Sequence, residues 1–323
     1  MLVWRSLEIG ERRIADTSRR QTVDNLILLI SCFVLGILLR RAGRMPESTP
    51  AVLNGFVINV SLPALTLLTL HHLHPQAALL YAALMAWLLF GLGAAFFYVM
   101  GKRLRLPGKT VGALMLTGGL GNTSFVGLPM IEAYYGHQAL GIGIIADQLG
   151  SFLVLATLGL LVAGYYTAER PSIGAIAKKI LLFPPFIALL AAVVLMPVAF
   201  PPWLESVLHR LGGTLAPLAL LSVGYQLRLG HLAGNSRNLA LGLVFKLIIG
   251  PALLLLLFVG VLGARGEVLQ VTLFEAAMAP MITGAIVALE HDLDPPLVGL
   301  MLGVGIPLSF LTLPVWWYLL RGF

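Results

Sequence analysis

The sequence predicts an all-α membrane protein with ten transmembrane helices, arranged as a 5+5 inverted repeat in which the fourth and ninth helices are broken and cross. Three observations predict this fold. The 323 residues are 59% hydrophobic and only 11% charged, with a mean hydropathy of +0.94, whereas soluble domains carry about 25% charged residues. Ten segments are long and apolar enough to cross a bilayer. Two of these segments, 110–135 and 267–290, carry a stretch of proline, glycine and polar residues that is expected to break the helix.

The ten apolar segments follow one another with short connections, and none of these connections is long enough to hold a soluble domain. The candidate spans cover residues 22–40, 50–70, 76–100, 110–135, 138–166, 176–199, 203–227, 238–263, 267–290 and 296–320. We therefore expect three regions, which are an N-terminal tail (1–21), a first five-helix repeat (22–166) and a second, inverted repeat (167–323).

The fourth span contains the strongest helix-breaking stretch of the chain. Residues 118–129 include four glycines, three consecutive polar residues and Pro129. Each glycine lowers helix propensity by about 1 kcal/mol relative to alanine, and the ring of Pro129 clashes with the carbonyl four residues earlier. Irregular backbone at mid-bilayer persists only inside protein or beside a water-filled cavity. We therefore expect two half-helices joined by a short unwound link.

The second half of the chain repeats the prolines of the first half. Pro63 in span 2 corresponds to Pro217 in span 7, and Pro129 in span 4 corresponds to Pro280 in span 9, at separations of 154 and 151 residues. Because each half has an odd number of spans, the second half must be inserted upside down, which places both broken helices at the same depth. Pro63 and Pro217 are expected to kink their helices and make room for that crossing.

Lysine and arginine predict the orientation. Outside the tail, connections on one side carry twelve of them and those on the other side carry three. The side with the excess should be cytoplasmic, so both termini are predicted to lie outside the cytoplasm, although five arginines of the tail oppose this orientation. The net charge of +7 is explained by the lysines and arginines of cytoplasmic loops. It therefore does not indicate nucleic acid as a partner. We expect an integral protein of a bacterial inner membrane.

Ionisable groups within spans are candidates for function, because they are costly in a bilayer. Asp147 and Gln148 lie in span 5, Lys246 in span 8 and Glu275 in span 9. These four are the candidates for proton coupling. The alternative for each is a structural contact inside the helical bundle, including a pair between Asp147 and Lys246.

No catalytic or metal-binding motif was found. The chain has no His-Glu-x-x-His, no Gly-x-Ser-x-Gly and no phosphate-binding glycine-lysine loop. Ser124 lies in a glycine-rich setting, but a nucleophilic serine needs an adjacent base, and His137 lies past the end of the span. His71, His72 and His74 have no carboxylate or cysteine beside them, so they are interpreted as an interfacial loop. The sequence predicts no enzyme, no metal and no cofactor.

Four motifs together resemble the auxin efflux carrier family. They are Gly121-Asn122-Thr123-Ser124-Phe125-Val126-Gly127-Leu128-Pro129, Leu215-Ala216-Pro217-Leu218-Ala219-Leu220, Lys246 with Pro251, and Ala276-Ala277-Met278-Ala279-Pro280. The resemblance covers nearly the whole chain except the tail. It implies a scaffold bundle, a core bundle and two crossing broken helices, as in bile acid:sodium symporters, with a substrate carboxylate near the crossing. One departure is that Ala279 separates Met278 from Pro280, where the family often has proline directly after methionine.

We therefore expect a secondary transporter of small organic anions such as carboxylates, working by alternating access around the crossing. The half-helices after the breaks are expected to begin near Leu128–Met130 and Pro280–Thr283. Half-helix N-termini carry partial positive charge and attract such anions. Asn59, one turn before Pro63, is expected either to reach the site or to bond a neighbouring helix. The expected substrate-binding residues are Asn59, Asn122, Thr123, Gly127, Pro129, Pro280, Thr283 and Gly284.

Several alternatives remain at this level. Sodium coupling is less favoured than proton coupling, because few oxygen ligands are expected at the crossing. The expected partners are a small carboxylate and membrane lipids, with a homodimer left open. The alternative function is a membrane-embedded ligand sensor that uses the same pocket.

Overall fold

The computed structural model describes residues 24–74, 76–167, 172–227 and 235–323, which form helices and no strands. The tail of residues 1–21 lies outside these ranges. Six uninterrupted helical segments in the described residues are long and apolar enough to cross a membrane, and a bent helix pair gives a seventh. These segments indicate an integral membrane protein. The count of ten spans and the inverted repeat stay predictions.

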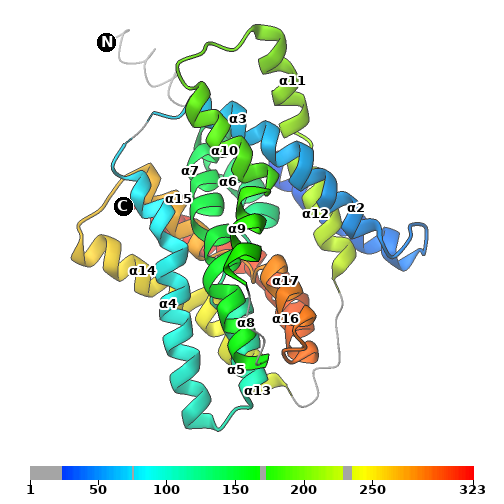
Figure 1. Ribbon diagram of the computed structural model, residues 1–323, viewed down its shortest axis with the longest axis vertical. Helices are drawn as coiled ribbons and strands as arrows, with labels where there is room; N and C mark the ends of the chain where they lie inside the picture. Colours follow the sequence, from blue (N-terminus) through cyan, green and yellow to red (C-terminus); the bar gives the residue numbers. More distant parts are fainter. Residues whose placement is uncertain (1–23, 75, 168–171, 228–234) are drawn as a thin grey trace, which may run out of the picture.

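The helices follow one another with short connections (Figure 1). A helix over residues 24–41 is followed by α2 (Thr49–Phe56), α3 (Leu62–His71), α4 (Leu79–Leu104), α5 (Gly108–Gly118), α6 (Leu128–Tyr135), α7 (Leu140–Ile145) and α8 (Leu160–Thr167). The second half contains α9 (Ile173–Leu181), α10 (Pro184–Leu195), α11 (Pro202–Gly212), α12 (Leu215–Gln226), α13 (Ser236–Val244), α14 (Gly250–Leu255), α15 (Glu267–Ala276), α16 (Ile282–Glu290) and α17 (Pro295–Leu320). The bent pair is α9 and α10, whose axes differ by 60°.

Several spans continue through π-helical turns, in which each N–H bonds five residues back. These turns cover Val57–Ser61, Thr123–Gly127, Ala146–Phe152, Leu155–Gly159, Phe245–Ile249 and Leu256–Val261, and a short 3-10 turn covers His137–Ala139. Three of the π-helical turns end two residues before Pro63, Pro129 and Pro251. A widened turn at this place relieves the clash of the proline ring with the preceding turn. Pro63 thus lies in an uninterrupted helical segment, and Pro217 lies in the first turn of α12.

The two spans predicted to be broken, 110–135 and 267–290, are interrupted in the structure, and each interruption is only a few residues long. The first break is residues 119–122, between α5 and the π-helical turn that starts at Thr123. The second break is residues 277–281, between α15 and α16. Pro280 lies within its break. Pro129 does not, because the helix has already restarted six residues before it. The expectation that the helix restarts near Leu128–Met130 is therefore wrong. The helix is broken at the glycine-rich stretch rather than at Pro129.

The two broken segments lie at the centre of the molecule, whereas α2, α4, α11 and α14 lie at its periphery (Figure 1). In α5 every residue from Thr110 to Gly118 is buried, and α15 is buried from Val271 to Ala276. A helix that is buried on all sides must be surrounded by other helices rather than by lipid. This placement meets the condition under which unwound backbone is tolerated inside a membrane.

Candidate functional site at the two helix breaks

The two breaks contact each other through their backbones. Gly121 and Pro280 pair as an isolated antiparallel bridge, and the N–H of Asn122 donates to the carbonyl of Ala279 at 2.8 Å. Buried backbone groups must find partners, and lipid provides none. The backbone groups in each break lack helical hydrogen bonds, and some of them find their partners in the other break.

Asn122 caps the helix that restarts after the first break. Its Oδ1 accepts from the N–H of Phe125 at 3.1 Å, and its backbone carbonyl accepts from the N–H of Gly127 at 2.9 Å. The side chain is 2% exposed, and its Nδ2 has no hydrogen-bond partner among the described residues. A buried donor without a partner costs about 1–3 kcal/mol. This amide therefore has an unused hydrogen-bond donor in the protein interior.

The two hydroxyls after Asn122 are held by a buried carboxylate. Thr123 Oγ1 donates to Asp147 Oδ1 at 2.5 Å, and Ser124 Oγ donates to the same oxygen. These bonds fix the first break against the π-helical turn Ala146–Phe152. The proposed pair between Asp147 and Lys246 is not among the ion pairs of the described residues.

Lys246 instead holds the end of the helix before the second break. Its ammonium group is buried and donates to the carbonyl of Ala276, the last residue of α15, at 2.7 Å. A cation at a helix C-terminus interacts favourably with the helix dipole and with the free carbonyls there. The ammonium nitrogen also lies 3.2 Å from the place that a Cβ on Gly121 would occupy, so it lies beside the first break as well.

The second break offers backbone rather than polar side chains. It consists of Ala277, Met278, Ala279, Pro280 and Met281. Met281 is the N-cap of α16 and makes no side-chain cap, although its φ of −72° and ψ of 121° suit a capping residue. The N–H groups of the first turn of α16 have no partner within their own helix. They are thus available to a bound group.

Glu275 packs against the helix that follows the first break. Its carboxyl group is fully buried, and neither oxygen has a hydrogen-bond partner among the described residues. A Cβ on Gly127 would stand 2.4 Å from Oε2 and 2.7 Å from Oε1 of Glu275. Gly143 is also close, since its Cβ would stand 3.3 Å from Oε1. The glycine at 127 is therefore required by the close approach of this carboxyl group.

Gly284, after the second break, makes the reciprocal contact. A Cβ there would stand 2.6 Å from the carbonyl oxygen of Leu116 in α5. Each restarting helix thus presents a glycine to the helix that precedes the other break. These contacts hold the four half-helices together.

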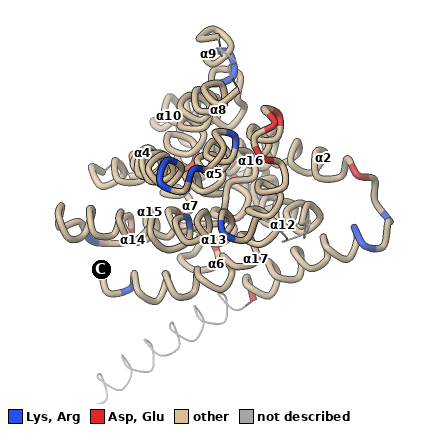
Figure 2. The backbone as a smooth tube through the Cα atoms, turned by 90° about the horizontal axis from the view of Figure 1, so that it is seen from below, with Lys and Arg blue, Asp and Glu red and all other residues tan. Residues whose placement is uncertain are grey.

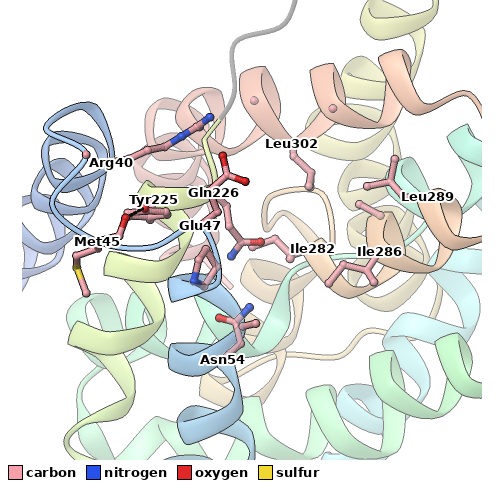
Figure 3. A pocket seen from close by; sticks show the side chains of 16 residues that line it. Arg40, Met45, Glu47, Asn54, Tyr225, Gln226, Ile282, Ile286, Leu289 and Leu302 are labelled. Atoms are coloured by element: carbon pink, nitrogen blue, oxygen red, sulfur yellow. Dashed lines mark hydrogen bonds between the residues drawn. The ribbon is translucent and has the colours of Figure 1, made fainter.

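Two cavities reach the start of α16. The larger, of about 650 Å³, lies between α2, α12, α16 and α17, and its lining includes Ile282 (Figure 3). The smaller, of about 160 Å³, is lined by Ser124 and Asp147 as well as by Met281 and Thr283. Asn122 lines neither cavity.

The structure brings most of the predicted site residues to the breaks, but not all. Asn122, Thr123, Gly127, Pro280 and Gly284 are buried there, Thr283 is half-buried, and Pro129 lies in the first turn of α6. Asn59 is exposed, and its Nδ2 donates to the carbonyl of Gly55 at 2.7 Å, so it does not join them. Gln148 donates to Thr66 Oγ1 at 2.7 Å.

Sequence reasoning missed the polar lining of the larger cavity. Asn54 and Gln226 line it from α2 and α12. The available signal was that both are amides inside apolar spans. The described residues contain no cluster of three or more His, Cys, Asp or Glu side chains that could hold a metal.

Comparisons with known proteins identify the family. The profile of the family described as membrane transport protein matches residues 22–317. An uncharacterised transporter of Methanothermobacter thermautotrophicus is 29% identical over 303 residues, which cover 92% of this chain and 96% of that protein. An uncharacterised transporter of Methanocaldococcus jannaschii is 24% identical over 312 residues, which cover 93% of this chain and 99% of that protein. The resemblance drawn from the four motifs is confirmed, and the chain belongs to the auxin efflux carrier-like family of membrane transport proteins.

Proposed function

We propose that this protein is a secondary transporter of small organic anions such as carboxylates, which bind where the two helix breaks meet. The observation that carries the proposal is the buried Nδ2 of Asn122, which finds no hydrogen-bond partner in the part of the chain that the structure describes. It belongs to the residue that bonds Ala279, close to the uncapped start of α16. A carboxylate accepts hydrogen bonds from such donors, and a helix N-terminus favours negative charge.

The charged side chains around the breaks suit reversible binding of an anion, which a transporter must also release. Lys246 provides the nearby positive charge, but it already bonds the Ala276 carbonyl. Asp147 already accepts from two hydroxyls. The substrate would therefore meet partial charges and the field of Lys246 rather than a dedicated ion-pair partner. Binding of this kind is reversible, as transport requires.

The ten-helix inverted repeat is part of the proposal. The reciprocal contacts of Gly127 with Glu275 and of Gly284 with Leu116 support it, because two halves related by symmetry would make equivalent contacts. In this arrangement the helices before the breaks belong to different halves of the chain. Each half therefore packs into the break of the other.

Contacts between distant connections support the same topology. Lys109 pairs with Asp292, and Arg40 donates to the carbonyl of Leu227 at 2.6 Å. The ten-span arrangement places all of these connections on the side predicted to be cytoplasmic. On the opposite side the N–H of Gly266 donates to the carbonyl of the C-terminal residue at 3.0 Å.

The distribution of charge agrees with the predicted orientation. Figure 2 shows Lys and Arg residues around the ends of α4, α5 and α9, which the topology assigns to one side. Arg170 and Arg228, which belong to the same predicted set, lie outside the described residues. The lining of the cavities points to that side too, because it includes Arg40 and Glu47 in the larger cavity and Lys179 and Glu290 in the smaller.

The conformation is consistent with one half of an alternating-access cycle, in which the core bundle moves against the scaffold. The two cavities give access to α16 from the proposed cytoplasmic side. On the other side the rings of His137 and His209 lie 5.6 Å apart, and His137 bonds Glu132 at 3.1 Å. We assign these contacts to the closed outer side.

Among the coupling candidates, the structure favours Asp147. It lines the smaller cavity, whereas Glu275 and Lys246 line neither cavity. A proton that arrives through that cavity meets Asp147, whose oxygen also holds the two hydroxyls of the first break. The sensor alternative has no observation in its favour.

The experiment replaces Asn122 by aspartate in proteoliposomes. Asn122→Asp keeps an oxygen that caps Phe125 but replaces the free NH₂ group by a second oxygen, which repels an anion. We expect counterflow of a labelled carboxylate, chosen by a thermal-shift screen, to fall at least tenfold while the melting temperature stays close to that of the wild type. Asn122→Ala is the second variant, and Asn59→Ala is the control. Full transport by both Asn122 variants would contradict the proposal.

A further inference from the structure

The larger cavity contains a second polar site, distant in sequence from both breaks. Asn54 on α2 and Gln226 on α12 point into it, and the amide of Gln226 extends toward Ile282 (Figure 3). The other side of the cavity, formed by Ile282, Ala285 and Ile286, is apolar. The two amides therefore provide polar groups on the wall opposite the start of α16.

A hydrogen-bond chain through Ser222 fixes how the two amides are oriented. Gln226 donates through Nε2 to the carbonyl of Ser222 at 3.3 Å and to its Oγ at 3.1 Å. Ser222 Oγ in turn donates to Asn54 Oδ1 at 2.6 Å. Because a backbone carbonyl can only accept, the NH₂ group of Gln226 must face Ser222. The hydroxyl proton of Ser222 is then directed to Asn54, whose oxygen must face it.

The remaining polar atoms of the two amides have no hydrogen-bond partner in the described part of the chain. Among the described residues no hydrogen bond is made by Oε1 of Gln226 or by Nδ2 of Asn54. Both residues are half-buried and line the cavity. The site thus combines one acceptor and one donor. A group that both donates and accepts a hydrogen bond satisfies both atoms, as a hydroxyl or a primary carboxamide does.

We propose that Asn54 and Gln226 bind a hydroxyl or carboxamide at the end of the substrate opposite its carboxylate. This inference rests on the proposed function, because it places the carboxylate at the helix breaks. The substrate then bridges the core helix α16 and the scaffold helices α2 and α12. The cavity, at about 650 Å³, has room for a chain of several carbon atoms between the two ends.

The test compares acids that differ only at the far end. Dissociation constants of the purified protein are measured by titration calorimetry for pentanoate, 5-hydroxypentanoate and glutaramate, and for the shorter set propanoate, 3-hydroxypropanoate and malonamate. Two further hydrogen bonds of ordinary strength are worth about a tenfold gain in affinity. We expect the hydroxy or carboxamide acid to bind about tenfold more tightly than the plain acid in at least one set.

Variants assign this preference to the two amides. Gln226→Met and Asn54→Leu keep the size of the side chain and remove its polar atoms, and each should lower the ratio of affinities to about three or less. Ser222→Ala releases the amides from their fixed orientation and should lower the ratio as well. Tyr225→Phe is the control, because the Tyr225 hydroxyl lines the same cavity but donates to the carbonyl of Met45 at 2.7 Å.

The outcomes separate this inference from the proposed function. Equal affinities within both sets, with the plain acids bound, would overturn the assignment of Asn54 and Gln226 alone. A preference that persists unchanged in Gln226→Met and Asn54→Leu would overturn it too. If none of the six acids binds, the proposed function fails and this inference fails with it.

Discussion

The two helix breaks are similar in position but different in chemistry. The first ends at Asn122 and is followed by Thr123 and Ser124, and its restarting helix is capped by the Asn122 side chain. The second has only apolar side chains, and Met281 leaves the start of α16 without a cap. One break therefore contributes side-chain groups to the site and the other contributes backbone.

The difference shows how a polar site can be built inside a membrane protein at low cost. A capped helix start is stable without a ligand, because its N–H groups are already partly satisfied. An uncapped start leaves N–H groups for a ligand, at the expense of stability when the site is empty. The first break therefore stays stable when the site is empty and offers the Asn122 side chain, whereas the second offers its free N–H groups.

The largest expected effect is on the packing that holds the breaks together. Gly284→Ala places a Cβ 2.6 Å from the backbone oxygen of Leu116, and a buried helix backbone cannot move aside cheaply. We expect the free energy of unfolding to fall by about 3 kcal/mol, measured by denaturant titration in detergent. Gly299→Ala in α17 is the control, since a Cβ there meets no atom within 4 Å. Equal stabilities for the two variants would show that the α16–α5 contact is looser than described.

The corresponding change at the first break should be smaller. Gly127→Ala brings a Cβ against the carboxyl end of Glu275, which is a side chain and can shift. We expect a loss of about 2 kcal/mol. Glu275→Ala should restore much of it, giving a coupling of at least about 0.5 kcal/mol in a double-mutant cycle. Strictly additive effects would refute the contact.

The smallest change makes the second break resemble the first. Met281→Ser supplies a hydroxyl that can cap α16, because the backbone of Met281 already has a suitable conformation. The cap, worth about 1 kcal/mol, competes with a bound anion, so we expect the affinity for a carboxylate to fall about fivefold. Met281→Ala, which removes the same side chain without adding a hydroxyl, is the matched control. Identical affinities in the two variants would mean that the N–H groups of α16 do not bind the anion.

Much of this arrangement could be predicted from local sequence, and the parts that could not depend on contacts between distant residues. The glycine-rich stretch predicted the first break and Pro280 predicted the second, because glycine and proline both disfavour a helix at their own positions. Pro129 misled the prediction of the restart, since a π-helical turn accommodates a proline without breaking the helix.

The orientation of individual polar side chains depended on partners that sequence does not show. Asn59 bonds its own helix at Gly55 rather than reaching the breaks. Lys246 bonds the end of α15, and Asp147 bonds the two hydroxyls of the first break. The orientation of the Asn54 and Gln226 amides is fixed by hydrogen bonds with Ser222, which lies 168 residues from Asn54 in the sequence.

The most direct test is an experimental structure of the protein with a bound carboxylate that it transports. The account predicts that a carboxylate oxygen lies within hydrogen-bond distance of Asn122 Nδ2 and that the anion also contacts the N–H of Ile282 or Thr283. A carboxylate bound elsewhere, with the Asn122 amide still unpartnered, would contradict it.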